Sequence, residues 1–504
     1  MTTAEYVDYL IAAASGDGTL PDVGNFYGNE FHSPDENDYL FSEDPALGLP
    51  WAKIADSTVS DAEKAISAAV EAFPAWSATS VTVRAALLNK VADILEPLSY
   101  KLAVLESKDQ GKTITTAKEV DIPRCLHNFR AFGTSILNHT STSTIQSEPI
   151  SALNIVTHDA VGPAVLICPW NLPLYLLSFK LAPALACGNT VIAKPSEMTS
   201  VTASVLAVAF KEAGAPPGVV NFIFGRGQTV GDYLVKSPAV KLVSFTGSTA
   251  VGKQIAIAAA TTNKKVSLEM GGKNAAVVFP SVDIPDTVAT LARSCFANQG
   301  EICLCTERLY VHADIYDTFL DQFVRETRKW QVGDPKDAKS RVGALISQPH
   351  FEKVNSYFKL AKSTKNAVVH CGGPVQLPEL QKGYFFAPTV VSNVADDSKL
   401  LTEEIFGPFV VVSPFKTTEE VIRKANSGNY GLSASILSQN IDEVTTVARA
   451  LKVGTVWANC WMVRDLRMPF GGTKESGSGR DGTAGDSLDF YSEKKTICIK
   501  FGQA

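Results

Sequence analysis

Cys303 lies in a polar, glycine-containing segment of the kind that can hold a catalytic nucleophile. The segment, from Phe296 to Glu307, reads Phe-Ala-Asn-Gln-Gly-Glu-Ile-Cys-Leu-Cys-Thr-Glu. The thiolate is the nucleophilic form of cysteine, so a catalytic cysteine needs surroundings that activate it. The seven histidines form no evident constellation with an aspartate or asparagine, which disfavours a cysteine–histidine protease. A single cysteine is often just a small buried apolar residue, and the segment itself leaves both interpretations open.

Cys303 and Cys305 form an isolated C-x-C pair. A zinc site needs further cysteine or histidine ligands, and no second pair stands at a suitable spacing. We therefore predict no metal site. Whether Cys305 protects Cys303 through a reversible disulfide or merely packs beside it stays open.

Polar or glycine-rich loops follow several short apolar runs in the first half of the chain. These runs, at 164–167, 190–193, 219–223, 242–245 and 266–268, alternate with helical patterns such as 200–213, which indicates a parallel sheet with crossover helices. Ligands bind at the carboxyl ends of strands in such sheets. We expect a ligand site from the loops Pro169-Trp170-Asn171, Lys194-Pro195-Ser196-Glu197, Gly225-Arg226-Gly227, Thr246-Gly247-Ser248 and Glu269-Met270-Gly271-Gly272.

Two glycine patterns differ in their context. Gly477-x-Gly479-x-x-Gly482 matches the dinucleotide-binding spacing but follows a polar loop, so we do not expect it to contact a cofactor. Gly225-x-Gly227-x-x-x-Gly231 misses that spacing by one residue, yet it lies between a predicted strand and a helix, where backbone amides can approach a phosphate. Ordinary turn glycines remain an alternative for the second pattern.

Other elements can be placed from periodicity and end signals. Ser60 and Glu63 form a possible capping box at the start of one helix, and further helical patterns cover 81–95 and 100–110. A second alternating region, a second α/β domain, begins near Asn274. Its expected strands are 275–279, 309–311, 410–412 and 455–458. The tail over 495–501 alternates apolar and polar residues and predicts an edge strand, which must be covered or paired.

Composition excludes several classes of protein. A chain of 504 residues is too long for a single hydrophobic core of ordinary size, so we expect more than one domain. The net charge of -6 and the lack of a basic cluster argue against nucleic acid or a membrane as partner. Nine scattered cysteines do not resemble a secreted disulfide scaffold. A signal or transit peptide would carry basic residues near the N-terminus, but no lysine or arginine precedes Lys53. The apolar stretch 161–193 is broken by Pro169, Asn171, Pro173, Lys180 and Pro183. We expect a cytoplasmic protein.

The chain resembles the aldehyde dehydrogenase superfamily from roughly residue 25 to its end. Ordered motifs carry the resemblance: Pro-Trp-Asn at 169–171, Lys-Pro-Ser-Glu at 194–197, Phe-Thr-Gly-Ser at 245–248, Leu-Glu-Met-Gly-Gly-Lys at 268–273, the segment around Cys303, Glu-Ile-Phe-Gly-Pro at 404–408 and Pro-Phe-Gly-Gly at 469–472.

The family chemistry assigns roles to the catalytic motifs. The resemblance implies that Cys303 attacks the aldehyde carbon and that Asn171, with the Cys303 backbone amide, holds the oxyanion. Hydride transfer to a nicotinamide then leaves a thioester. Glu269 would activate the water that hydrolyses it.

The resemblance also implies NAD as cofactor. Lys194 and Glu197 match positions that contact the adenosine ribose, where a carboxylate accepts hydrogen bonds from both hydroxyls and repels the 2′-phosphate of NADP. Other matching cofactor positions lie along the chain at Ile167, Trp170, Gly225, Gly227, Ser248, Gly271, Glu404 and Phe406.

Substrate motifs resemble the muconic semialdehyde branch of the superfamily. They are Glu-Ser-Lys-Asp-Gln-Gly-Lys-Thr at 106–113, Asp-Ile-Pro-Arg at 121–124, Pro-Trp-Asn-Leu-Pro-Leu-Tyr-Leu-Leu at 169–177 and Asn-Cys-Trp-x-x-Arg at 459–464. Arg124 and Arg464 match carboxylate-binding positions, because a guanidinium can hold a carboxylate with two hydrogen bonds. Salt bridges are an alternative role for both arginines. Arg130 and Arg467 are nearby substitutes, and Arg467 departs from the neutral residue expected there.

The expected reaction is oxidation of 2-aminomuconate 6-semialdehyde, an aldehyde of tryptophan catabolism, with 2-hydroxymuconic semialdehyde as a second substrate. General aliphatic or betaine aldehydes are alternatives, although two arginines would repel a cationic aldehyde. An acylating enzyme would usually lack a base at the Glu269 position. A non-catalytic protein of the same fold is the remaining alternative.

The resemblance implies an α/β fold in three parts. A Rossmann-like NAD-binding domain would comprise 1–137 and 160–269, and an α/β catalytic domain would cover 270–480. A small β oligomerisation arm would comprise 138–159 and 481–504. We expect a homodimer or homotetramer formed through the C-terminal strand.

Overall fold

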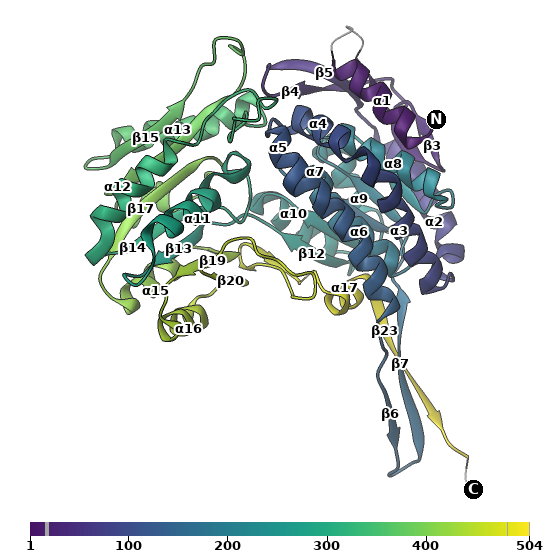
Figure 1. The fold of residues 1–504 in the computed structure, drawn as a ribbon. Helices are drawn as coiled ribbons and strands as arrows, with labels where there is room; N and C mark the ends of the chain where they lie inside the picture. Colours follow the sequence, from purple (N-terminus) through teal and green to yellow (C-terminus); the bar gives the residue numbers. More distant parts are fainter. Residues whose placement is uncertain (16–19, 481, 503–504) are drawn as a thin grey trace.

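The computed structural model describes residues 1–15, 20–480 and 482–502 (Figure 1). Residues 16–19 of the predicted NAD-binding domain and residues 481, 503 and 504 of the predicted arm lie outside these ranges. The described chain builds two large sheets flanked by helices and a narrow sheet that extends away from both (Figure 1).

The first large sheet has eight strands, of which the central five are parallel. Chain order reverses between β8 and β11, and ligands bind at such switch points, outside the carboxyl ends of the strands. In spatial order the strands are β22 (Gly477–Ser478), β12 (Lys265–Glu269), β11 (Leu242–Thr246), β8 (Ala164–Ile167), β9 (Val191–Lys194), β10 (Val220–Phe222), β2 (Asn25–Tyr27) and β3 (Glu30–His32).

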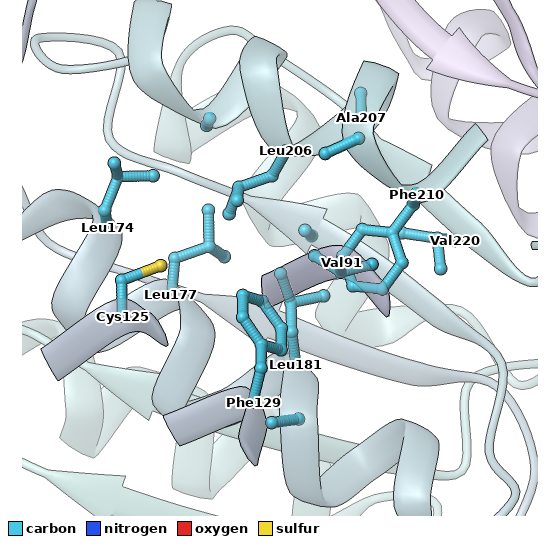
Figure 2. Close-up of a cluster of buried hydrophobic side chains, with 14 of the residues drawn as sticks. Val91, Cys125, Phe129, Leu174, Leu177, Leu181, Leu206, Ala207, Phe210 and Val220 are labelled. Carbon is cyan, nitrogen blue, oxygen red and sulfur yellow. The ribbon is translucent and has the colours of Figure 1, made fainter. Parts of the chain in front are cut away.

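Side chains alternate between the two faces along each strand, and both faces of this sheet are buried. Leu166 of β8 packs into one apolar cluster, whereas its neighbour Val165 packs into another. The first cluster joins α3 (Val81–Leu95), α6 (Ile122–Leu137), α7 (Pro173–Ala186) and α8 (Val201–Ala213), and Figure 2 shows its interior. The second joins α2 (Val59–Ser77), α9 (Asp232–Lys236) and α10 (Thr249–Ala260).

The second large sheet has seven strands and also carries helices on both faces. Its order is β15 (Val368–Pro374), β16 (Phe386–Ser392), β17 (Phe409–Phe415), β14 (Thr306–His312), β13 (Asn274–Val278), β19 (Ser433–Leu437) and β20 (Thr455–Ala458). One core lies under α11 (Ile284–Phe296) and α12 (Tyr316–Thr327). Other cores lie under α13 (Gln348–Ser363), α15 (Thr418–Asn426) and α16 (Ile441–Ala450).

The narrow sheet forms an arm in the order β23 (Ser492–Lys500), β7 (Ala152–Ala160) and β6 (Ser143–Gln146) (Figure 1). The expected edge strand at the C-terminus is therefore confirmed, since β23 pairs with β7 along one side only. Smaller elements are α1 (Thr3–Ala14), β1 (Asp22–Val23), β4 (Tyr39–Asp44), β5 (Leu49–Ala55), α4 (Ser99–Gln110), α5 (Ile114–Thr116), α14 (Lys399–Thr402), β18 (Tyr430–Gly431), β21 (Thr473–Lys474) and α17 (Ala484–Tyr491). None of the described helices has the length and apolar character needed to cross a membrane.

Most predicted elements lie within two residues of their observed ends, but the first capping box was wrong. The cap of α2 is Thr58, whose hydroxyl accepts from the Asp61 backbone amide while the Asp61 carboxylate accepts from that of Thr58. Asp61 replaces the usual glutamate of this motif, so the signal lay two residues before the Ser60 and Glu63 pair.

Candidate active site

Cys303 lies between the two large sheets, in the loop that connects α11 to β14. Asn298 and Gln299, at φ 52° and 56°, place this loop in the left-handed backbone region, which is uncommon outside glycine. The Asn298 side-chain amide donates to the backbone carbonyls of Asn171 (3.1 Å) and Glu301 (3.3 Å). These contacts fasten the loop of Cys303 to the loop that follows β8.

Asn171 is buried and held from several directions. Its side-chain Nδ2 donates to the Glu301 carbonyl at 2.7 Å, and its own carbonyl accepts from the buried Lys112 ammonium at 3.0 Å. An amide nitrogen carries two hydrogens. One N–H of Asn171 therefore remains available to an oxygen atom of a ligand.

A cavity of about 170 Å³ brings Cys303 and Asn171 together with several residues predicted to contact the cofactor. A Cβ at Gly271 would lie 2.2 Å from the Glu404 carboxylate, so a larger residue there would displace the end of that side chain. That carboxylate accepts from the Gly272 backbone amide at 2.7 Å. The predicted residues that line the cavity are Trp170, Asn171, Ser248, Gly271, Cys303, Glu404 and Phe406.

Glu269 ends strand β12 and is buried beside this cavity. Its Oε2 accepts from the Thr246 hydroxyl at 2.8 Å and lies 3.8 Å from the Lys180 ammonium. Within the described part of the chain its Oε1 has no hydrogen-bond partner. A buried carboxylate oxygen normally accepts a hydrogen bond. A bound water is a suitable donor to Oε1.

Burial raises the pKa of the Cys303 thiol to about 12, and the negative charges of Glu269 and Glu404 act in the same direction. The positive charge of Arg464 acts in the opposite direction. Cys303 is therefore a thiol at neutral pH in this state. A nucleophilic reaction requires transfer of its proton, and Glu269 is a nearby base.

A second cavity, of about 580 Å³, lies outside the ends of β8 and β9 and is lined by Ile167, Lys194, Glu197 and Gly227. Lys194 is buried and its ammonium lies 3.4 Å from the Glu197 carboxylate. Ile167, at the end of β8, lines this cavity, whereas Trp170, in the loop that follows β8, lines the cavity of Cys303. Together the two cavities can accommodate an elongated ligand such as a dinucleotide.

Ser248 caps α10, where its hydroxyl accepts from the Val251 backbone amide at 3.4 Å. The amides of such a helix start favour an anionic group such as a pyrophosphate.

The two glycine patterns have different roles in the fold. Gly227 lines the second cavity, but Gly225 does not, because it packs against the chain: a Cβ at Gly225 would lie 2.8 Å from the Ser57 backbone nitrogen. Gly477 lies in β22, where a Cβ would be 2.2 Å from the Leu268 carbonyl. The pattern that begins at Gly477 thus permits close strand pairing.

A third cavity, of about 340 Å³, is lined by Arg124, Tyr175 and Trp461, and also by Ile302, which directly precedes Cys303. Arg124 extends from α6, with its guanidinium carbon 5.3 Å from the Tyr175 ring centre. Figure 2 shows its neighbour Cys125 in the core between α6 and α7, so core packing fixes this helix.

Arg464 stacks its guanidinium carbon 3.8 Å from the centre of the Phe470 ring. Its buried Nη2 has no hydrogen-bond partner among the residues that the structure describes. A buried charged nitrogen without a partner is costly, which suits a site that receives an anion. In contrast, the predicted substitutes are engaged at the surface: Arg130 pairs with Asp93 and Glu96, and Arg467 pairs with Asp465.

Lys180 and Glu301 are site residues that the sequence analysis missed. Lys180 lies in the apolar helix α7 and its ammonium donates to the Ser244 hydroxyl at 2.9 Å, below Glu269. The single lysine within an apolar helix could have indicated that Lys180 has a buried partner. Nothing in the sequence could have identified Glu301, because it is the backbone carbonyl of this residue that contacts Asn171.

Comparisons with known proteins agree with this arrangement. The Aldehyde dehydrogenase family profile matches residues 31–497. The chain is 49% identical to 2-aminomuconic semialdehyde dehydrogenase of Mus musculus, over 95% of this chain and 98% of the relative. It is 40% identical to 2-hydroxymuconic semialdehyde dehydrogenase of Pseudomonas sp. (strain CF600), over 90% and 95%. An NAD+ complex of an aldehyde dehydrogenase from Bacillus cereus superposes with a TM-score of 0.92, at 35% identity, over 95% of this chain and 97% of that one.

Proposed function

The chain belongs to the aldehyde dehydrogenase family and is an NAD-dependent oxidoreductase that acts on aldehydes, and we propose that it oxidises 2-aminomuconate 6-semialdehyde to 2-aminomuconate. We propose 2-hydroxymuconic semialdehyde as a second substrate, since relatives named for both aldehydes match most of the chain. The observation that carries the proposal is the pair of arginines, Arg124 in the third cavity and Arg464 with its unpartnered Nη2. Both suit a carboxylate at the end of the substrate distant from the aldehyde.

In the first half of the proposed reaction, Cys303 Sγ attacks the aldehyde carbon after its proton passes to Glu269. The oxyanion of the resulting thiohemiacetal accepts from the free N–H of Asn171 and from the Cys303 backbone amide. The loop contacts of Asn171 fix this donor before the reaction. The residues that line the first two cavities would hold NAD, which would supply the acceptor for the hydride of the tetrahedral carbon, so that Cys303 would carry a thioester.

Glu269 then releases the proton of Cys303 to solvent. In the second half, the Glu269 carboxylate removes a proton from a water that attacks the thioester carbon. Its unpartnered Oε1 supports this role. The carbon–sulfur bond then breaks, Cys303 regains a proton and the product leaves as a carboxylate. Overall, one aldehyde, one NAD+ and one water yield one carboxylate, one NADH and two protons.

Truncation of either arginine tests the carboxylate site. Arg124→Ala and Arg464→Ala should each raise the KM for 2-hydroxymuconate 6-semialdehyde about 10- to 100-fold, because each removes a charged hydrogen bond worth roughly 1.5–3 kcal/mol. The KM for hexanal, which lacks a carboxylate, should change little. Steady-state kinetics with both aldehydes measure the contrast, and Arg130→Ala, at the surface pair with Asp93, is the matched control. Equal kinetics of both variants and wild type on the semialdehyde would exclude the carboxylate site.

We also propose that Glu197 sets the preference for NAD over NADP. Glu197→Gln should raise kcat/KM for NADP by about tenfold, because it removes the repulsion of the 2′-phosphate by a half-exposed carboxylate. Binding of 2′,5′-ADP, measured by calorimetry, should strengthen in parallel, while binding of 5′-AMP should not. An unchanged ratio of the two affinities would assign the preference elsewhere.

We propose a homodimer or homotetramer in which the arm pairs with another subunit. The outer edge of β23 has no partner strand within the described chain, and Ile497, Ile499 and Phe501 are exposed there. An exposed edge strand of this kind commonly pairs with another chain. A cytoplasmic location and a role in tryptophan catabolism complete the proposal. Nine free cysteines support a reducing compartment.

A further inference from the structure

Arg293 lines the third cavity together with Arg124, although the two residues come from different parts of the fold. Arg124 belongs to α6 beside the first large sheet, whereas Arg293 is in the last turn of α11 beside the second. The Arg293 side chain is exposed, while Arg124 is half-buried. Arg293 therefore lies at the solvent side of the cavity, where a substrate enters.

The charges around this cavity are predominantly positive. Neither Arg124 nor Arg293 forms an ion pair with any residue in the described part of the chain. His127 also lines the cavity, and burial together with the charge of Arg124 lowers its pKa, so this histidine is neutral at pH 7. Glu119, exposed at the rim, is the one carboxylate among the described lining residues. Two unpaired guanidinium groups and one carboxylate leave an electrostatic attraction for anions.

Arg293 also has a structural contact. Its guanidinium carbon lies 5.9 Å from the centre of the Trp461 ring, and the Trp461 indole N–H donates to the Leu304 carbonyl at 3.0 Å. Leu304 follows Cys303 directly, so Arg293 could affect the nucleophile through packing alone. Packing would affect every aldehyde, whereas attraction would affect charged aldehydes.

We propose that Arg293 is a specificity-determining residue that draws aldehydes carrying a carboxylate into the third cavity, where Arg124 then binds the carboxylate. This inference rests on the proposed function and extends it to the entrance of the site. A charge at the rim of a binding site mainly changes the rate of association and its dependence on salt. Arg293 thus raises kcat/KM for anionic aldehydes at low ionic strength.

The experiment compares Arg293→Met and Arg293→Lys with the wild type on 2-hydroxymuconate 6-semialdehyde and on hexanal. At low salt Arg293→Met should lower kcat/KM for the semialdehyde about three- to tenfold and leave hexanal unchanged, because methionine keeps the packing on Trp461 but not the charge. Arg293→Lys should restore most of the loss. At roughly 0.5 M salt, where the Debye length is only a few ångströms, the difference should largely disappear.

Arg325→Ala is the matched control, since this exposed arginine of α12 lies outside the cavities and pairs with Asp321. It should behave as wild type on both aldehydes. Equal losses of Arg293→Met on both aldehydes would overturn the proposal in favour of packing on Trp461. Unchanged kinetics of Arg293→Met alongside impaired Arg124→Ala would also overturn it, yet would leave the proposed function standing. If Arg124→Ala and Arg464→Ala are unimpaired as well, the proposed function itself fails.

Discussion

Cys303→Ala should lower the rate of NADH formation by at least about 10⁴-fold, because no other residue can form the covalent intermediate. Cys305 is too deeply buried to substitute: its side chain is 3% exposed, burial raises its pKa well above the usual range, and its thiol donates to the Ala297 carbonyl at 3.8 Å. The alanine variant should still bind NAD, since the residues at both cofactor cavities are unchanged apart from one thiol. Absorbance of NADH at 340 nm measures the rate, and calorimetry measures NAD binding.

Cys305→Ala is the matched control for this experiment. It removes a thiol from the same loop without removing the nucleophile, so most of the activity should remain. Substantial NADH formation by Cys303→Ala, within about a hundredfold of the wild type, would show that oxidation proceeds without a covalent thioester.

Glu269→Gln should separate the two halves of the reaction. The amide cannot accept a proton from water, so hydrolysis of the thioester should slow about 10²- to 10⁴-fold. If thiol activation is slowed less than hydrolysis, a rapid burst of close to one NADH per active site should precede a very slow steady state. Stopped-flow absorbance measures the burst, and the mass of acid-quenched enzyme should increase by that of the acyl group.

The contrary outcome for Glu269→Gln is equally clear. A slow steady state without a burst, and without an acyl group on the protein, would mean that this residue acts before hydride transfer. Glu269 would then serve mainly to remove the proton from Cys303, whose pKa of about 12 makes that step demanding.

Much of the fold followed from periodicity, because both faces of each central strand are buried. The run at 164–167 matches β8 at both ends, and 81–95 matches α3, where Ser80 provides the cap. Positions in the candidate site followed from a different property. Strand-end loops of a parallel sheet meet at one edge, so Trp170, Lys194 and Ser248 could be grouped before any geometry was known.

Contacts between distant side chains could not be predicted in this way. The bond from Asn171 to the Glu301 carbonyl joins two loops 130 positions apart and involves a backbone atom that every residue possesses. The partners of Arg130 and Arg467 were equally hidden, since an arginine at a surface pair and one in a cavity look alike in sequence. Glycine spacing was misleading at Gly225 as well, where close packing against the backbone of the α2 entry loop, and not a cofactor, explains the glycine.

The catalytic residues come from both large sheets, and this division affects how the protein becomes active during its synthesis. Asn171 and Glu269 precede Cys303 in the chain, and the Glu301 carbonyl that positions Asn171 belongs to the later part. A nascent chain that has completed only the parallel strands of its first sheet therefore lacks both the nucleophile and the correctly held oxyanion donor. Catalysed oxidation of an aldehyde therefore begins only when the two sheets have come together.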